Sequence, residues 1–177
     1  MLFPYVESKR IVLRPATGAD GAEVYDVLFR AGAPGLPALD VFLDRFERGV
    51  QAQFLVYRRD SDDLVGHAAL SDLAVAGHVR AAVFAAADPG EGIAADAAAL
   101  LVNFAFAMWR IRKVYFESHL ADLAEFGFTG DRAAVVRTEA VLPEHLWFRG
   151  RLWDQYVHAV YREHWDVDGV ELLKEIV

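Results

Sequence analysis

The feature that most constrains how this chain can fold is an apolar run that begins directly after a chain-breaking turn. Residues 87–104 read ADPGEGIAADAAALLVNF, so proline and glycine meet a stretch rich in alanine and leucine. From Ile93 to about Arg110 the sequence is apolar nearly all round, which is typical of a helix buried on more than one side. The chain is therefore expected to place a core helix against a glycine turn.

Backbone chemistry suggests a function for this junction. The first N–H groups of a helix have no acceptor within the helix, and the helix dipole adds partial positive charge there. A glycine turn lets a pyrophosphate approach these groups closely. The alternative is a turn that only caps a core helix, because PGEG is shorter than the dinucleotide and P-loop fingerprints and lacks their Lys-Ser/Thr pair. The residues alone leave both interpretations open.

Alternating and helical patterns along the 177 residues predict one mixed α/β domain. Strands are expected at residues 8–15, 54–58, 64–73, 79–86, 113–117, 133–142 and 155–161. Helices are expected at residues 17–32, 39–47, 93–110 and 170–176. Gly150 is expected in the hairpin between the last two strands.

Composition argues against several classes of protein. The formal net charge is −8, whereas a nucleic-acid partner needs a basic surface. The chain has no cysteine, which removes disulfides, thiolate nucleophiles and cysteine-bound metals and fits a cytoplasmic location. The longest apolar stretch is shorter than the ~20 residues of a membrane span, and the N-terminus lacks the order of a signal peptide. No histidine spacing fits a metal motif, so no metal site is expected.

Four segments in order resemble one family. They are ESKRIVLRPATGADGAEVYDVL at 7–28, LVGHAALSDL at 64–73, GEGIAADAAALLVNFAFAMWRIRKVYFES at 90–118 and EHLWFRGRLWDQYVHAVYREHW at 144–165. Together they resemble the GNAT N-acetyltransferase superfamily, and most closely its branch of ribosomal-protein N-terminal alanine acetyltransferases. On this resemblance residues 1–165 form a GNAT-like acyltransferase domain, and residues 166–177 are a C-terminal extension of it.

The resemblance implies a particular fold and cofactor site. The fold is a mixed, mostly antiparallel sheet that is splayed between its fourth and fifth strands and flanked by helices. Acetyl-CoA, or another acyl-CoA, would bind in the gap. Its pyrophosphate would rest on the turn before the core helix, and its pantetheine amides would pair with the edge of the fourth strand. The cofactor-binding residues expected on this basis are Val83, Ala85, Ala87, Gly90, Glu91, Gly92, Ile93, Ala94 and Ala95.

The resemblance also implies an activity, which is acetyl transfer to a primary amine by direct attack. The amine is either a small molecule or a protein N-terminus, and it would enter near residues 31–40 and 149–154. There Arg149 and Arg151 could hold an acidic substrate group, or they are simply solvated. Neither a nucleic acid nor a membrane is expected as a partner, and a homodimer is left open.

Three positions depart from the family pattern. Pro89 stands where a basic or amide residue would hold phosphate, and Glu91 adds a carboxylate between the glycines. No Asn follows the fifth strand on the cofactor side. The fourth strand offers Arg80 where many relatives have a glutamate that acts as a base through water. These departures motivate an alternative, in which the chain is a catalytically eroded ligand-binding or interaction module.

Candidate catalytic residues are His67, Ser118 and His119. His67 lies in a predicted strand, and it either acts as a base in the gap or is hydrogen-bonded within the sheet. Ser118 and His119 follow the fifth strand, where the departing thiolate would lie, and are the nearest substitutes for the acid of the family. The sequence leaves open whether His67 or His119 faces the gap.

Overall fold

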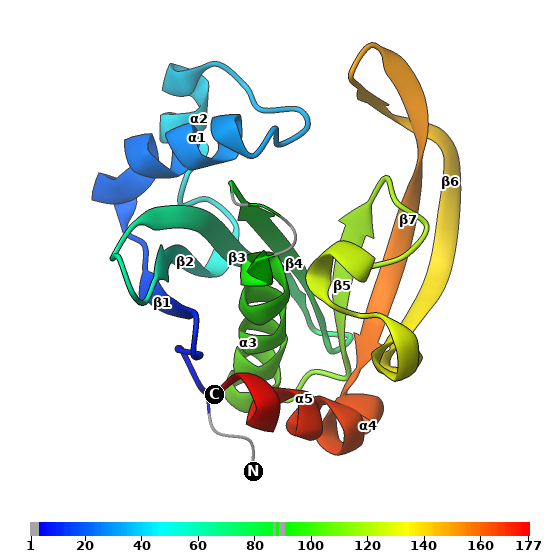
Figure 1. The fold of residues 1–177 in the computed structure, drawn as a ribbon. Helices are drawn as coiled ribbons and strands as arrows, with labels where there is room; N and C mark the ends of the chain where they lie inside the picture. Colours follow the sequence, from blue (N-terminus) through cyan, green and yellow to red (C-terminus); the bar gives the residue numbers. More distant parts are fainter. Residues whose placement is uncertain (1–3, 87, 89–90) are drawn as a thin grey trace.

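The computed structural model describes residues 4–86, 88 and 91–177, which form a seven-stranded mixed sheet (Figure 1). The strand order is β1-β2-β3-β4-β5-β7-β6. Among the described residues β4 and β5 are parallel, and the other neighbouring strands are antiparallel. The strands are β1 Ile11–Pro15, β2 Val50–Arg58, β3 Leu64–Ala74, β4 His78–Ala85, β5 Lys113–Ser118, β6 Val136–Phe148 and β7 Arg151–Tyr161.

Helices cover both faces of the sheet. One face packs against α3, and the other face of the β2–β4 half packs against α1 and α2. The helices are α1 Gly21–Arg30, α2 Leu39–Arg45, α3 Ile93–Met108, α4 Arg162–His164 and α5 Val170–Ile176. Short 3₁₀ turns lie at Gly18–Asp20, Ala124–Phe126 and Gly130–Val135, and a wider turn of π type lies at Trp165–Gly169. No described helix is long and apolar enough to cross a membrane.

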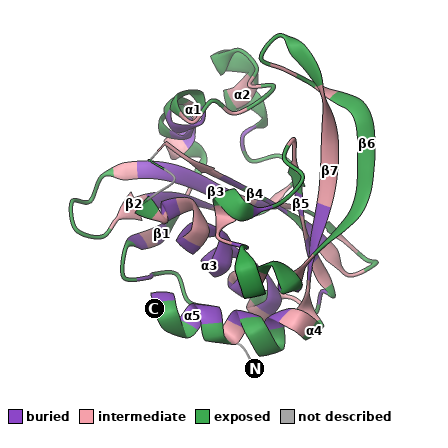
Figure 2. Cartoon of the chain, turned by 45° about the vertical axis from the view of Figure 1, so that its right-hand side comes forward, coloured by how far each residue is buried: buried purple, intermediate pink, exposed green. Residues whose placement is uncertain are grey.

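The core helix predicted from the apolar run is α3. Its alanine and leucine side chains are buried on several sides, and Figure 2 shows the helix enclosed within the fold. The helix ends at Met108, slightly before the expected end, because Trp109 is in an extended conformation. The Arg162 guanidinium closes this end by donating hydrogen bonds to the carbonyls of Phe106, Trp109 and Ile111.

The sheet is splayed between β4 and β5. Their pairing runs from His78 opposite Lys113 to Ala81 opposite Phe116, and both strands then continue without each other. Figure 1 shows the upper ends of β4 and β5 diverging. The expected fold class, a mixed and mostly antiparallel sheet opened between its fourth and fifth strands, is confirmed.

The last hairpin is longer than expected. The sequence placed the end of β6 at residue 142, but the strand continues to Phe148 and pairs with β7 through Phe148 opposite Arg151. The segment read as a loop because it contains Pro143 and many polar residues. An edge strand tolerates both, since one of its sides needs no partner. Figure 2 shows β6 exposed along most of its length.

Residues 166–177 pack against the rest of the domain. Leu172, Leu173 and Ile176 are buried in the main core, and the Lys9 N–H donates to the Ile176 carbonyl over 2.7 Å. Trp165 is fully buried, and a Cβ placed on Gly169 would lie 2.3 Å from its ring. The absence of a side chain at position 169 therefore lets this turn close over the tryptophan.

Candidate active site

A cavity of 570 Å³ lies where β4 and β5 diverge. It is bounded by the loop after α1, the ends of β4 and β5, the turn at Ala124–Phe126 and the tip of the β6–β7 hairpin. A smaller cavity of 140 Å³ reaches the first turn of α3. The residues that line both cavities are Ala31, Val83, Phe84, Glu125 and Phe126. The two cavities therefore form one trough from the hairpin to the start of α3.

The edge of β4 forms one wall of this trough. On one side β4 is paired with β3 as far as Ala85, which lies opposite Gly66. On the other side the ladder with β5 ends at Ala81. Among the described residues, Val83 and Ala85 therefore belong to a strand edge that has no strand partner on the cavity side, and an extended ligand can pair with such an edge.

The first turn of α3 follows a glycine in the left-handed region, where Gly92 has φ of +71°. The Asp96 N–H is bonded to the Gly92 carbonyl over 3.0 Å, so the preceding N–H groups of the helix lack acceptors in the helical ladder. Ile93 and Ala94 line the smaller cavity. Of the remaining expected cofactor residues in this turn, Ala87 and Gly90 lie outside the described residues, as does Pro89.

An arginine from the start of β1 lies against this turn. A Cβ placed on Gly92 would be 3.2 Å from Cζ of Arg10. The Arg10 guanidinium binds the Asp96 carboxylate, with Nε 3.0 Å from Oδ2, and its side chain is 48% exposed. Asp96 is only 1% exposed and also accepts a hydrogen bond from the Ser8 hydroxyl over 2.6 Å. A buried ion pair thus holds a half-exposed guanidinium at the helix start.

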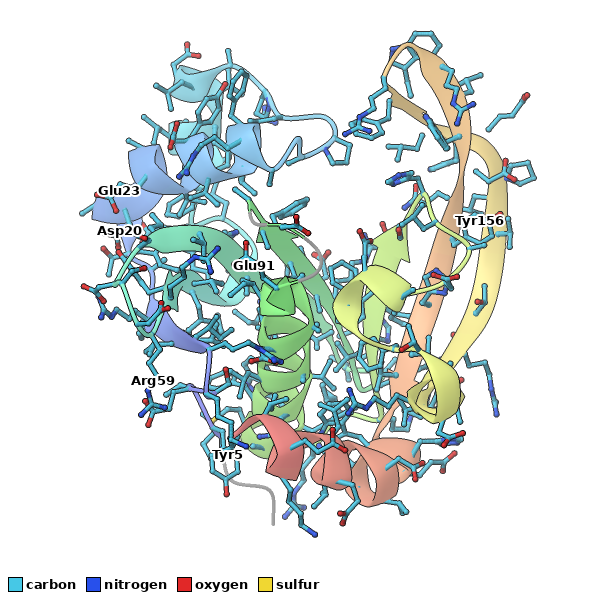
Figure 3. The ribbon with its side chains drawn as sticks, viewed as in Figure 1. Tyr5, Asp20, Glu23, Arg59, Glu91 and Tyr156 are labelled. Carbon is cyan, nitrogen blue, oxygen red and sulfur yellow. The ribbon has the colours of Figure 1, made fainter. Side chains whose placement is uncertain are left out.

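The carboxylate of Glu91 is already bound within the protein. Glu91, which is labelled in Figure 3, forms an ion pair with Arg58 at the end of β2, and this contact lowers the pKa of the Glu91 carboxyl group. The sequence showed only an added negative charge between the glycines. In the folded chain that charge is accompanied by the cations of Arg58, at the end of β2, and Arg10, directly before β1, both remote in sequence.

Two of the predicted catalytic residues line the larger cavity. His119 packs against Trp153 and Phe148, with ring centroids 5.1 and 5.4 Å away. Burial lowers the pKa of His119, and the positive charges of Arg149 and Arg151 lower it further, so the imidazole is neutral at pH 7.

The neighbouring Ser118 also lines this cavity and bridges two groups. Its oxygen accepts a hydrogen bond from the Leu120 N–H over 3.0 Å, and its hydroxyl is hydrogen-bonded to Glu125. The structure therefore brings Ser118 and His119 together at the end of β5.

His67 lies elsewhere. It is 7% exposed, sits between Leu55 on β2 and Phe84 on β4, and has its ring 6.3 Å from that of Phe46. Burial lowers its pKa to about 4, and its Nε2 has no hydrogen-bond partner among the described residues. It lines neither cavity, so the structure does not bring it together with Ser118 and His119.

Sequence reasoning missed Glu125, which lines both cavities. Partial burial raises the pKa of its carboxyl group, as does the neighbouring charge of Asp122, while the Ser118 hydrogen bond opposes both. Glu125 lies in the EFGF stretch at residues 125–128, and nothing in that stretch indicates a cavity. Its position depends on the turn at Ala124–Phe126, which packs against α3 and, through Phe126, against Phe116 of β5.

A second unpredicted group, in the lining of the larger cavity, joins residues of four strands. Nη1 of Arg80 on β4 lies 3.2 Å from Oε1 of Glu117 on β5. Nε2 of Gln155 on β7 donates to the other oxygen of Glu117 over 2.6 Å, and Nε of Arg80 is 3.7 Å from Asp72. These contacts link the diverging strands below the trough. No sequence signal could have found them, because the partners are far apart along the chain.

Across residues 4–86, 88 and 91–177, no three histidine, aspartate or glutamate side chains gather in an arrangement that could hold a metal ion.

A sheet that opens between parallel fourth and fifth strands, with a trough leading to the start of the following helix, defines the GNAT acetyltransferase fold, and this chain has that fold. No protein-family model matches the sequence. A search of curated proteins found no match either.

Solved structures with this fold include several acetyltransferases. A mutant form of the spermidine/spermine N-acetyltransferase SpeG from Vibrio cholerae superposes with a TM-score of 0.72 at 13% identity, over 88% of this chain and 95% of that one. A probable GNAT-family acetyltransferase from Chromobacterium violaceum gives 0.68 at 18% identity, over 92% and 88% of the two chains. A GNAT-family acetyltransferase from Bacillus anthracis gives 0.64 at 16% identity, over 89% and 98%. At such identities the likeness concerns the fold alone.

Proposed function

We propose that this protein is an acyl-CoA-dependent N-acyltransferase that moves an acetyl group from acetyl-CoA to a primary amine. The observation that carries the proposal is the trough between the diverging ends of β4 and β5. It joins an unpaired strand edge, a helix start with free N–H groups and a cavity lined by a neutral histidine. Each of these parts matches one requirement of acyl transfer from a nucleotide thioester.

The residues present fit acetyl-CoA. Backbone groups of Val83 and Ala85 would pair with its amides, as in strand addition. The N–H groups from Ile93 to Ala95 would receive its pyrophosphate, since a helix start favours anions. Arg10 and Arg58 place guanidinium groups close to this turn, where the family has a basic residue and this chain has Pro89, although each is paired with a carboxylate, Asp96 or Glu91. Bound acetyl-CoA would supply an activated thioester carbonyl.

The protein must then orient the amine and remove one proton. The amine nitrogen attacks the thioester carbon, the new C–N bond forms, the C–S bond breaks, and the sulfur leaves as a thiolate. His119, which is neutral at pH 7, would accept the proton lost by the nitrogen. Positioning is worth about 7–11 kcal/mol in favourable cases, and a base adds about 10²–10⁴-fold in rate.

The acceptor follows less directly. The sequence motifs that resemble the ribosomal-protein N-terminal alanine acetyltransferases suggest a peptide N-terminus. The structural relative from Vibrio cholerae is a spermidine/spermine N-acetyltransferase, which suggests a polyamine. Both kinds of acceptor have a primary amine in common, which is the group that the trough would receive.

The test combines binding with turnover. Acetyl-CoA at 100 times its dissociation constant should stabilise the protein by about 2.7 kcal/mol, which is a rise of a few degrees in melting temperature for a chain of this size. Release of free CoA in the presence of a broad panel of amines should follow. If neither acetyl-CoA nor any other acyl-CoA shifts the melting temperature, the cofactor site does not exist and the proposal is wrong.

A second function is favoured by one observation, which is the carboxylate of Glu91 in the turn that would hold the pyrophosphate. On this alternative the chain is a GNAT-fold module that binds a ligand or partner without catalysis. Binding of acetyl-CoA without release of CoA, across the whole amine panel, would support the module over the enzyme.

A further inference from the structure

The charges that line the larger cavity are unevenly compensated. In its floor Arg80 is neutralised by Glu117 and Asp72. Two other charged groups of the lining, Arg149 and Glu125, form no ion pair with any described residue. Arg149 belongs to the hairpin tip and lines the larger cavity but not the smaller one. Glu125 lines both cavities, and the smaller one leads to α3. Among the described residues, the trough therefore has a cation without an ion pair toward the hairpin. Toward the proposed cofactor side it has a carboxylate that is hydrogen-bonded to Ser118 but forms no ion pair.

Arg149 is held in place by its backbone and by two contacts. Its φ of +50° is unusual for a non-glycine residue and belongs to the tight turn with Gly150. Its guanidinium carbon lies 4.9 Å from the centre of the Phe148 ring. A Cβ placed on Gly32 would be 3.7 Å from Nη2 of Arg149, so the guanidinium spans from the hairpin to the loop after α1.

A second arginine adds to the positive charge at this end. The guanidinium carbon of Arg151 lies 3.4 Å from the centre of the Trp153 ring, and that ring contacts His119. Both arginines lower the pKa of His119, which shows that their charge reaches the cavity. A cation–π contact with an aromatic ring holds the guanidinium in position, but it does not neutralise the positive charge.

We infer that the acceptor is a small primary amine that also carries a carboxylate, as a free amino acid does, and that Arg149 binds this carboxylate. The inference rests on the proposed function, because it concerns the acceptor of the same site. Arg149 pairs with carboxylates in a planar two-bond geometry that an ammonium group of lysine cannot reproduce. The amino group of the acceptor would then point toward Glu125 and His119, where the thioester is proposed to lie.

The size of the cavity favours a small acceptor over a peptide. A volume of 570 Å³ is within the range of small-molecule sites. The approach of Arg149 to Gly32 narrows the space between the hairpin and the loop after α1. A peptide N-terminus has its nearest backbone carboxylate at the far end of its chain, so it would leave Arg149 without a partner.

The experiment compares matched acceptors with acetyl-CoA as donor. Each free amino acid is assayed beside its C-terminal amide and its decarboxylated amine, together with short peptides, and CoA release is measured. We expect kcat/KM to be at least about tenfold higher for the best free acid than for its amide, because one charged hydrogen-bonded contact is worth about 1.5–3 kcal/mol. Arg149→Met should bring this ratio close to one, mainly through KM, and Arg149→Lys should restore part of it.

Arg137→Met is the matched control. Arg137 belongs to the same hairpin and also lies over an aromatic ring, 5.1 Å from the centre of Tyr161, but it lines neither cavity. It should keep the acid-to-amide ratio of the parent protein. Melting temperatures of all variants show whether they fold.

Three outcomes overturn the inference. They are amides or decarboxylated amines that react as well as the free acids, peptides that react better, and an acid preference that survives Arg149→Met. In each of these cases acyl transfer still occurs, so the proposed function stands. If no acyl-CoA binds and no amine releases CoA, the proposed function is wrong and the inference falls with it.

Discussion

Arg58 at the end of β2 forms an ion pair with Glu91 in the turn that precedes α3. The contact joins two parts of the chain that sequence patterns treat as unrelated. In this ion pair the Glu91 carboxylate, which lies in the turn proposed to bind pyrophosphate, is held by Arg58. The Arg58 guanidinium is thereby engaged and is not available to bind phosphate.

Glu91→Gln should therefore strengthen CoA binding. The change removes a like charge from the turn and frees Arg58 for a charge-assisted contact, so the dissociation constant should fall by about tenfold at low salt. The gain should shrink as salt is raised, because the groups are partly exposed. Titration calorimetry with CoA measures it.

Glu23→Gln is the control for Glu91→Gln, since it removes one negative charge from the exposed face of α1 (Figure 3). It should leave the affinity near that of the parent protein. Unchanged or weaker CoA binding by Glu91→Gln would contradict the proposed position of the pyrophosphate.

Asp96→Ala should destabilise the fold. Asp96 is buried and holds both the Ser8 hydroxyl and the Arg10 guanidinium, so its removal leaves these partners unsatisfied at the start of α3. Because Arg10 is half exposed, we expect the free energy of unfolding to fall by about 2–3 kcal/mol, which is less than the loss for a fully buried ion pair. Urea unfolding measures the free energy.

Asp26→Ala provides the comparison for Asp96→Ala. Asp26 pairs with Arg30 along the surface of α1, over 2.9 Å. Such exposed helix pairs contribute about 0.3–0.5 kcal/mol. A loss for Asp96→Ala no larger than this would show that the buried contacts do not anchor the helix start.

His67 should make the stability depend on pH. Its pKa is about 4 in the folded protein and near 6.5 when unfolded, so between these values the unfolded chain binds more protons. The free energy of unfolding should therefore be highest above pH 6.5 and fall as the pH drops toward 4, by about 3 kcal/mol from this group.

Unfolding curves of His67→Asn at several pH values test this origin. The variant has no imidazole to protonate, so the part of the pH dependence that comes from His67 should vanish. His145→Asn changes an exposed histidine of the hairpin and should keep the slope of the parent protein. An unaltered slope in His67→Asn would mean that other groups cause the acid sensitivity.

His119→Gln should lower kcat by about 10²–10⁴-fold if His119 is the base. The lowered pKa of His119 also predicts that kcat/KM of the parent enzyme stays high below pH 6.5. Arg151→Met removes one of the charges that lower this pKa, so the acidic limb of the pH profile should move to higher pH. If the acidic limb of the pH profile does not move in Arg151→Met, or if His119→Gln keeps full activity, His119 is not the base.

The general fold could be predicted because its signals are local. The apolar run of α3, the glycine turn before it and the alternating strands each lie within a short window of sequence. The opening of the sheet between β4 and β5 was expected from the resemblance to the GNAT superfamily, and not from these local signals. The length of β6 could not be predicted, because Pro143 and the polar residues around it are as typical of a loop as of an edge strand.

The site was predicted only in part. Ser118 and His119 were named because they lie at the end of the fifth strand, and both line the cavity. His67 was named because it lies in a predicted strand, but β3 is covered on both faces and its sequence does not show which face a residue takes. Arg149 was already expected near the entry of the amine, but its place in the cavity lining became visible only in the folded chain, as did Glu125 and the contacts around Arg80.

The sequence by itself determined which segments are helices and strands, and where a turn meets the core helix, because periodicity and chain breakers act over a few residues. Only the tertiary structure decided which charges meet. Arg10 binds Asp96, 86 residues further along, and Arg58 binds Glu91, because β1, β2 and the start of α3 converge at one end of the sheet. Contacts of this kind depend on strand order and register, which no single stretch of the sequence encodes.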